Sequence, residues 1–125
     1  MNVVDSSGWL EYLSNGPNAP YFAEPLLNSN ELIVPTISVY EVFKRMSRER
    51  GIDAAFAAAG FMYQGEVVPL NGMLAIDAVY LSRQLALPMA DSIILAMASA
   101  RGATLWTQDR DFAAIDGVKY IAKRH

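Results

Sequence analysis

The sequence predicts an α/β protein in which helices cover both faces of a central, mainly parallel sheet of about five strands. Short β-branched runs alternate with longer helical patterns along the chain, and strands separated by helices form parallel sheets. The length of 125 residues fits one domain, residues 1–125. Hydrophobic residues make up 53% of the chain and charged residues 18%, which favours a buried core over disorder.

The first half of the chain is expected to contain two strands and four helices. Asn2-Val3-Val4 is the first strand, and Asp5-Ser6-Ser7 has the composition of a helix start. The elements expected next are a helix that Gly16-Pro17 stops, a helix over 19–27 that Pro25 would bend, a strand over 31–34 closed by Pro35, a helix from the capping residue Thr36 to Arg50, and a helix over 52–63. Gly51 is well placed to end the longest of these helices.

The second half is expected to add three strands and two longer helices. The strands lie over 66–70, 104–106 and 118–121, the last of them after a turn at Asp116-Gly117. Asn71 is expected to cap one helix. Asp91 opens the other, which is apolar nearly all round, so this helix should be buried centrally.

Composition excludes several classes of protein. There is no cysteine, so disulfide scaffolds, thiolate zinc sites and cysteine nucleophiles are ruled out. The single histidine, His125, argues against a Ser-His-Asp hydrolase and a multi-histidine metal centre. The most apolar run, residues 92–100, is far shorter than the ~20 residues of a spanning helix, and Asp5 lies where a signal peptide would be basic. We therefore expect a cytoplasmic protein without membrane contact.

Acidic side chains follow the predicted strands at the points where those strands end. Asp5 follows the first strand, Asp109 and Asp111 follow the fourth, Asp91 precedes the fourth, and Glu41 lies two turns into the helix after the second. Because the ends of adjacent parallel strands are ~5 Å apart, these acids can converge. Converging carboxylates repel one another unless a cation holds them, and an all-oxygen ligand set selects Mg²⁺ or Mn²⁺. Such ions are suited to phosphodiester hydrolysis.

Each of these acids also has a purely structural interpretation. The alternatives are helix caps at Asp5 and Asp91, a surface ion pair of Glu41 with Lys44 or Arg45, and a cap of a short helix over 112–114 by Asp109 or Asp111. The spacing along the sequence leaves both interpretations open.

Four blocks of the sequence, in order and spanning essentially the whole chain, carry a resemblance to a known family. They are Val3-Val4-Asp5-Ser6-Ser7, residues 35–42 (PTISVYEV), residues 89–96 (MADSIILA) and residues 103–112 (ATLWTQDRDF). With them the chain resembles the PIN domain, and within that family the VapC-type toxins of bacterial toxin–antitoxin pairs. The first two blocks are weak signals, whereas the last two, correctly spaced behind them, are specific.

The resemblance implies a PIN-like three-layer α/β/α sandwich and a metal-dependent ribonuclease. The family's four acidic positions fall on Asp5, Glu41, Asp91 and Asp109, of which Asp5, Asp91 and Asp109 would hold the Mg²⁺ or Mn²⁺ ion. The positions implied to support the carboxylates are Ser6 and Thr107, with Asp111 as an extra or supporting acid. A small residue is common in the family where this chain has Leu95. The resemblance also implies a homodimer and a small VapB-like antitoxin that covers the active-site groove.

A basic run on the helix after the second strand is the candidate binding surface for RNA. The chain carries a net charge of −3, so the repulsion between the acids and RNA must be offset locally. Lys44, Arg45 and Arg48 are expected to meet substrate phosphates, because positions 41, 45 and 48 lie at i, i+4 and i+7 on one helix face. A solvated helix face is the alternative interpretation.

Two other families with a parallel α/β sheet require motifs that this chain lacks. A response-regulator receiver would need paired acids after its first strand and an Asp after its third, and a haloacid-dehalogenase-type phosphatase would need Asp-x-Asp where this chain has Asp5-Ser6-Ser7. This chain lacks the residues that each of these two families requires, so both are excluded. A housekeeping PIN-domain RNA-processing nuclease, and a non-catalytic PIN-fold binding module, stay as alternatives.

Overall fold

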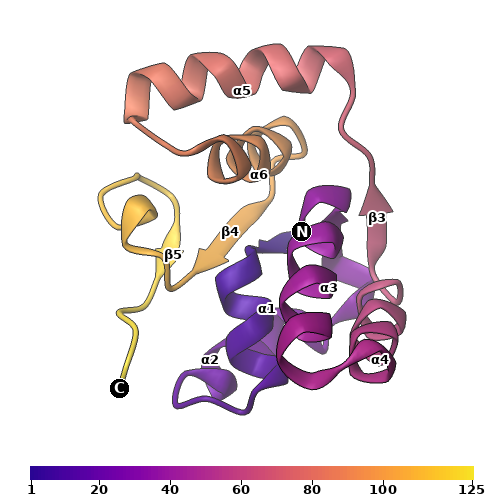
Figure 1. Ribbon diagram of the computed structural model, residues 1–125. Coiled ribbons are helices and arrows are strands. Elements are labelled where there is room, and N and C mark those ends of the chain that lie inside the picture. Colours follow the sequence, from indigo (N-terminus) through magenta and orange to yellow (C-terminus); the bar gives the residue numbers. More distant parts are fainter.

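Five parallel strands form the sheet of the computed structural model, which describes residues 1–125 (Figure 1). Their order across the sheet is β3-β2-β1-β4-β5, and every neighbouring pair runs parallel. The strands are β1 (Asn2–Val4), β2 (Leu32–Pro35), β3 (Glu66–Val68), β4 (Thr104–Thr107) and β5 (Lys119–Tyr120). The first strand of the chain thus lies at the centre, between β2 and β4.

Helices cover both faces of this sheet, which confirms the predicted three-layer α/β/α arrangement. Figure 1 shows α1 to α4 on one face and α5 and α6 on the other. The helices are α1 (Ser6–Leu13), α2 (Ala19–Leu26), α3 (Thr36–Arg50), α4 (Ile52–Met62), α5 (Gly72–Leu85) and α6 (Met89–Ala100), with short 3₁₀ helices η1 (Ser29–Glu31) and η2 (Arg110–Phe112). None of them is both long enough and apolar enough to span a bilayer.

Successive residues of the central strands enter two separate cores, because side chains alternate between the faces of a sheet. Val4, Val34 and Trp106 pack with residues of α1 to α4 such as Trp9 and Phe22. Their neighbours Val3, Ile33 and Leu105 pack on the opposite face with Ile94, Leu95 and Ala98 of α6. Both faces are therefore buried, as the continuous apolar runs of these strands require.

Helix α6 is buried between the sheet and α5, as its all-round apolar sequence predicts. Every residue from Ser92 to Ala98 is buried. Ile94 and Leu95 face the sheet core, whereas Ile93 and Met97 pack with Ala78 of α5. Helix α5 packs on α6 rather than on the strands, so it is the outermost layer of this face (Figure 1).

The structure confirms two of the predicted helix caps, Asn71 and Gly51. The side chain of Asn71 accepts a hydrogen bond from the backbone N–H of Leu74, 2.9 Å away, at the start of α5. Gly51 ends α3 with φ +92°, in the region that favours glycine, and α4 begins at the next residue. These two helices therefore fold back on each other with a single residue between them.

Some predicted boundaries are wrong by one or two residues. Thr36 does not cap α3, because β2 continues through Pro35 and that residue takes the cap position without a side-chain hydrogen bond. Helix α6 begins at Met89, so Asp91 lies in its first turn instead of opening it. Strand β3 stops at Val68, since Pro69 has no N–H for the ladder. Further small differences are the ends of α2 at Leu26 and α4 at Met62, and the extent of β5, Lys119–Tyr120.

Candidate active site

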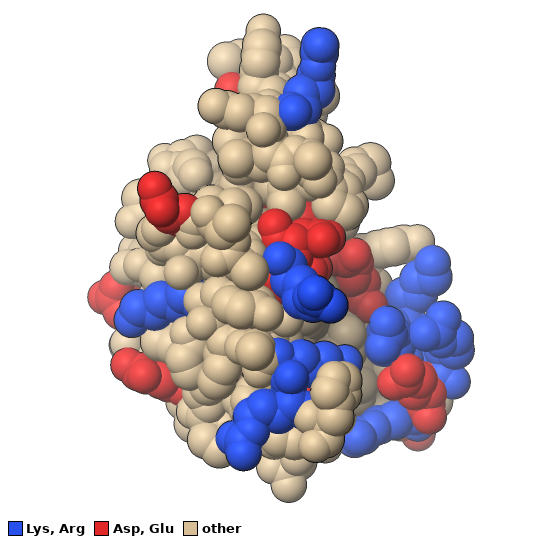
Figure 2. All heavy atoms as spheres, turned by 90° about the vertical axis from the view of Figure 1, so that its left-hand side faces the viewer, with Lys and Arg blue, Asp and Glu red and all other residues tan.

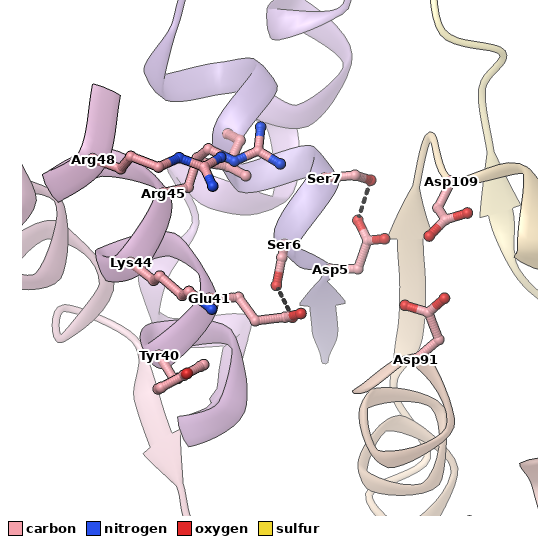
Figure 3. A pocket seen from close by; sticks show the side chains of 11 residues that line it. Asp5, Ser6, Ser7, Tyr40, Glu41, Lys44, Arg45, Arg48, Asp91 and Asp109 are labelled. Atoms are coloured by element: carbon pink, nitrogen blue, oxygen red, sulfur yellow. Dashed lines mark hydrogen bonds between the residues drawn. The ribbon is translucent and has the colours of Figure 1, made fainter. Parts of the chain in front are cut away.

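A pocket of about 350 Å³ opens at the carboxyl ends of β1 and β4. The chain leaves β1 toward β2 on one side, while β4 lies on the other side of β1. Such a switch point leaves a crevice outside the strand ends, where the sites of parallel α/β proteins lie. Four acids from four segments line the pocket: Asp5, Glu41, Asp91 and Asp109 (Figure 3).

Asp5 is the most enclosed of these acids, with only 2% of its surface exposed. Its Oδ1 accepts hydrogen bonds from Ser7 Oγ at 2.7 Å and from the backbone N–H of Gly8 at 3.0 Å. Its Oδ2 accepts one from Thr107 Oγ1 at 2.6 Å. Burial raises the pKa of Asp5 from 3.8 to about 6, although these hydrogen bonds lower it. Asp5 is thus both the cap of α1 and a member of the pocket, so the two interpretations of this residue are compatible.

Asp91 and Asp109 point toward one another across the mouth of the pocket (Figure 3). Burial, followed by the negative charges of Asp109 and Asp5, raises the pKa of Asp91 to about 8. Asp109 also caps η2, since its Oδ1 accepts from the backbone N–H of Asp111 at 2.9 Å. Asp91 caps no helix, because its side chain lies inside the first turn of α6 and faces the other acids.

Asp111 lies close enough to Asp91 and Asp109 to be a metal ligand itself. Asp91, Asp109 and Asp111 each offer a carboxylate oxygen within 4.8 Å of the others, a spacing that could hold one metal ion. Asp5 is not in this trio, and hydrogen bonds already occupy much of its lone-pair capacity. The geometry therefore adds Asp111 to the residues that can reach a cation beside Asp91 and Asp109.

Glu41 reaches the pocket from the second turn of α3. Its Oε1 accepts a 2.6 Å hydrogen bond from Ser6 Oγ at the start of α1. Neither Lys44 nor Arg45 forms an ion pair with Glu41. Arg45 pairs instead with Glu49, 3.5 Å away. The predicted surface ion pair of Glu41 is therefore absent, and its second oxygen remains open to the pocket.

Basic side chains form the wall of the pocket opposite Asp91 and Asp109. Lys44, Arg45 and Arg48 all line it from α3, on the helix face that also carries Glu41 (Figure 3). Lys44 lies over the ring of Tyr40, with its Nζ 5.7 Å from the ring centroid. Figure 2 shows acidic side chains near the middle of this side of the molecule, with basic side chains beside and below them. An anion can thus meet cations next to the carboxylates.

Sequence reasoning assigned no role to two residues that shape the pocket. Ser7 donates to Asp5 and lies 3.5 Å from Thr107 Oγ1, and its position in the Asp5-Ser6-Ser7 motif was the available signal. Tyr40 lines the pocket with 63% of its surface exposed. Its position next to Glu41 was the only indication in the sequence. The other predicted site residues either line the pocket or form hydrogen bonds with residues that line it. Their roles stay predictions.

The electrostatics of the cluster fit a divalent cation. Burial, with the neighbouring carboxylates as a smaller cause, raises the pKa values of Asp5 and Asp91, and a cation bound among them would stabilise their charged forms. Asp91, Asp109 and either Asp5 or Asp111 supply only oxygen donors, as Mg²⁺ and Mn²⁺ prefer. The pocket can therefore combine a hard cation with an anion bound by the α3 cations.

Comparisons with known proteins concern the family and the fold of the chain. The model of the family described as PIN domain matches residues 3–118. A toxin–antitoxin complex from Klebsiella pneumoniae has a chain with a TM-score of 0.79 and 22% identity, covering 94% of this chain and 95% of that one. VapC20 of Mycobacterium tuberculosis, described as a sarcin–ricin loop cleaving toxin, has a TM-score of 0.79, 19% identity and coverages of 95% and 98%.

A third structure, DNA-bound VapBC from Salmonella typhimurium, has a TM-score of 0.73, 19% identity and coverages of 98% for both chains. At these identities the three structures show a shared fold along almost the whole length. None of the curated protein sequences matches the chain.

Proposed function

The chain belongs to the PIN domain family, and we propose that it is a metal-dependent ribonuclease toxin of the VapC type. The observation that carries the proposal is the pocket in which acids that follow β1 and β4, together with acids of α3 and α6, face three cations of α3. The structural similarity to a chain of a toxin–antitoxin complex supports the toxin assignment. We place this activity in the cytoplasm, where RNA is available.

Asp91 and Asp109 would hold a Mg²⁺ or Mn²⁺ ion together with Asp5 or Asp111. Such an ion, when bound, supplies an activated water and offsets charge on the phosphate oxygens. Thr107 and Ser7 keep the carboxylate of Asp5 in one orientation through their hydroxyl groups. Carboxylates that are already held in one orientation bind a metal ion more tightly, because they lose less conformational entropy when the ion binds.

The remaining side chains of the pocket bind and orient the substrate. Arg45 and Arg48 face the space in front of the carboxylates and can pair with two phosphate groups of an RNA strand. Glu41, whose Oε1 is fixed by Ser6, can accept the proton of the attacking water at Oε2.

The antitoxin is proposed to cover the face formed by α3 and α4. The exposed apolar side chains of Ile52 and Phe56 lie on α4, and that of Tyr63 directly follows it. Phe56 packs edge-to-face on Phe43 of α3, with ring centroids 5.1 Å apart, and α3 carries the basic residues of the pocket. A partner segment with apolar and acidic side chains would match this surface and block the pocket at once.

Self-association is proposed for the outer face of α5. Met73, Ile76, Val79 and Tyr80 are each more than half exposed there. The helix carries only one acid and one base, Asp77 and Arg83. A nearly uncharged apolar face suits pairing with a second copy of itself, since a two-fold interface brings the same patch from both chains together.

Cleavage of RNA with and without EDTA tests the catalytic proposal. We expect the purified protein to cleave a structured RNA in Mg²⁺ or Mn²⁺, and to lose this activity in EDTA. Asp5→Ala and Asp91→Ala should abolish cleavage and growth inhibition while the fold survives. Asp116→Ala, an exposed acid before β5, serves as the matched control and should remain active. Full activity in EDTA would contradict the proposal.

Co-purification tests the toxin assignment against a housekeeping RNA-processing role. The prediction is that a small protein encoded next to this chain binds it and suppresses cleavage. A nuclease that is active, harmless to growth and free of such a partner would be a housekeeping enzyme instead.

A further inference from the structure

Three polar side chains are buried behind the carboxylate pocket and take no part in the proposed chemistry. They are Glu11 of α1, Asn18 before α2, and Gln108 after β4, with 8%, 2% and 6% of their surfaces exposed. Burying such groups costs free energy unless they are hydrogen-bonded to one another. Their presence in an otherwise apolar interior therefore calls for an explanation.

The three residues form a closed ring of hydrogen bonds, through their side chains and the backbone N–H of Asn18. Oε2 of Glu11 accepts from the backbone N–H of Asn18 at 2.7 Å, and its Oε1 accepts from Nε2 of Gln108 at 3.3 Å. Oε1 of Gln108 in turn accepts from Nδ2 of Asn18 at 3.0 Å. No ion pair involves Glu11, so its buried carboxylate is stabilised only by hydrogen bonds from uncharged donors.

The turn after α1 is shaped to receive this carboxylate. A Cβ atom on Gly16 would lie 2.5 Å from the carboxyl atoms of Glu11, so only glycine lets the turn approach so closely. Nδ2 of Asn18 also donates to the carbonyl oxygen of Ala122 at 3.0 Å. The ring is thus enclosed by the turn on one side and by the C-terminal segment on the other.

Gln108 connects this ring to the acids of the pocket, because it lies between Thr107 and Asp109 in sequence. Thr107 Oγ1 donates to Asp5 at 2.6 Å and accepts from the backbone N–H of Asp109 at 2.9 Å. The backbone N–H of Gln108 donates to Ser7 Oγ at 3.4 Å. The segment 107–109 is therefore fixed from the pocket side by hydroxyl groups and from the interior by the side chain of Gln108.

We propose that Gln108 is a positioning residue, and that the ring Glu11–Asn18–Gln108 fixes Asp109 where its carboxylate can share one cation with its neighbours. The inference rests on the proposed metal-dependent function. The backbone has already left β4 at Gln108, so the ladder no longer holds it there. The ring replaces the missing ladder bonds, and the register of Asp109 depends on it.

Exchanging the two side chains tests this directly. In Glu11→Gln, two amide NH₂ groups face each other, and in Gln108→Glu two carboxylates do. The double variant E11Q/Q108E remakes every bond of the ring: the new Gln at 11 donates to the new Glu at 108, which also accepts from Asn18. The amide oxygen at 11 accepts from the Asn18 N–H as before.

The readouts are Mn²⁺ affinity by calorimetry without RNA, ribonuclease rate, and melting temperature. Each single variant should bind Mn²⁺ about 10-fold more weakly or worse, measured well below its melting temperature. The double variant should recover wild-type affinity and rate, or exceed them, because it brings a negative charge next to Asp109. Asn2→Val is the matched control: it removes the 2.8 Å hydrogen bond from Trp106 Nε1 at the opposite end of the sheet. It should leave Mn²⁺ affinity unchanged.

Three outcomes separate the possibilities. Single variants that melt lower but bind Mn²⁺ within twofold of wild type would make the ring a stabilising element only, and overturn the inference. If the single variants do not fold, Gln108→Met and the double variant E11Q/Q108E are measured in their place. A Gln108→Met variant that folds and binds Mn²⁺ within twofold of wild type overturns the inference. A double variant that folds but does not recover Mn²⁺ affinity overturns it as well. A wild-type protein that binds no Mn²⁺ contradicts the proposed function itself.

Discussion

The Oγ1 atom of Thr107 lies 2.6 Å from Oδ2 of Asp5, so a hydroxyl group at the end of β4 holds the carboxylate that follows β1. Both side chains are buried, and a hydrogen bond to a charged group in such a place contributes ~1.5–3 kcal/mol. The bond joins two neighbouring strands at the point where the pocket opens. It therefore couples the stability of the sheet to the ionisation of Asp5.

Replacing Thr107 with Val should reduce ribonuclease activity about 10–100-fold and shift its pH dependence. The Thr107 hydrogen bond lowers the pKa of Asp5, which burial holds at about 6. Without the bond this pKa rises further, so ionised Asp5 appears only at higher pH. Rates measured from pH 5 to 9 should show the acidic limb of the profile displaced upward.

Thr107→Ser retains the hydroxyl group and should restore both the rate and the profile. A Thr107→Val profile that falls in height without moving along the pH axis would show that Asp5 does not titrate in the rate-limiting step.

Replacing Asp91 with Asn should stabilise the metal-free protein at neutral pH. The pKa of Asp91 is about 8 in the folded protein against 3.8 for an ordinary Asp. The free energy of unfolding of the wild type therefore falls as pH rises from about 4 to about 8, since the unfolded chain releases this proton first. Asn avoids that loss, and the melting temperature in EDTA at pH 7.5 should rise by about 3–6 °C, or ~1 kcal/mol.

The difference between Asp91→Asn and wild type should nearly vanish at pH 4, and added Mg²⁺ should narrow it at pH 7.5 by stabilising the wild type alone. Asp116→Asn controls for a change of net charge. If Asp91→Asn melts below wild type in EDTA at pH 7.5, the carboxylate instead stabilises the first turn of α6.

Replacing Arg45 and Arg48 together with Ala should weaken RNA binding and its dependence on salt. Each phosphate contact on a single strand contributes ~0.7 to the slope of log K against log[salt], so this slope should fall by about 1.4. Binding is measured in EDTA, which keeps the RNA intact. The double variant Arg83→Ala with Arg101→Ala removes two exposed cations away from the pocket. An equal effect of both pairs would mean that only the net charge matters.

Charges placed on the two exposed apolar faces should separate self-association from antitoxin binding. Val79→Glu on α5 should convert a dimer to a monomer in sedimentation experiments at micromolar concentration, because a two-fold interface would bury the new charge twice. Phe56→Glu on α4 should leave the oligomeric state unchanged and weaken antitoxin binding. Each variant is the control for the other, and a monomeric wild type would contradict the proposed dimer.

Local patterns predicted the elements well, because the signals for them lie within a few residues. Asn71 caps α5 through its side chain, Gly51 ends α3 with a positive φ, and the apolar sequence of α6 indicated its burial between two layers. The two wrong caps are Thr36 and Asp91, because a polar residue near a helix start resembles a cap. Whether it is one depends on the backbone path, and the preceding prolines, Pro35 and Pro88, take the cap positions instead.

The convergence of the acids could not be derived from spacing, because it depends on strand order. Asp5 and Thr107 are 102 positions apart, and no local signal states that β1 pairs with β4. The same is true of Asp111, whose distance from Asp91 is set by the fold of η2. The resemblance to a family supplied the missing long-range information, whereas the ring around Gln108 had no counterpart among the motifs.

The central position of β1 also determines when the pocket can form during synthesis. Residues 2–4 leave the ribosome early, but their partner strand, residues 104–106, follows about 100 residues later, and translation adds ~5–20 residues per second. Asp5 therefore waits several seconds for Thr107 and Asp109. A nascent chain that ends before β4 carries Asp5 and Glu41 without Asp91 and Asp109 in place, so the carboxylate pocket forms only after residues 104–109 have been added.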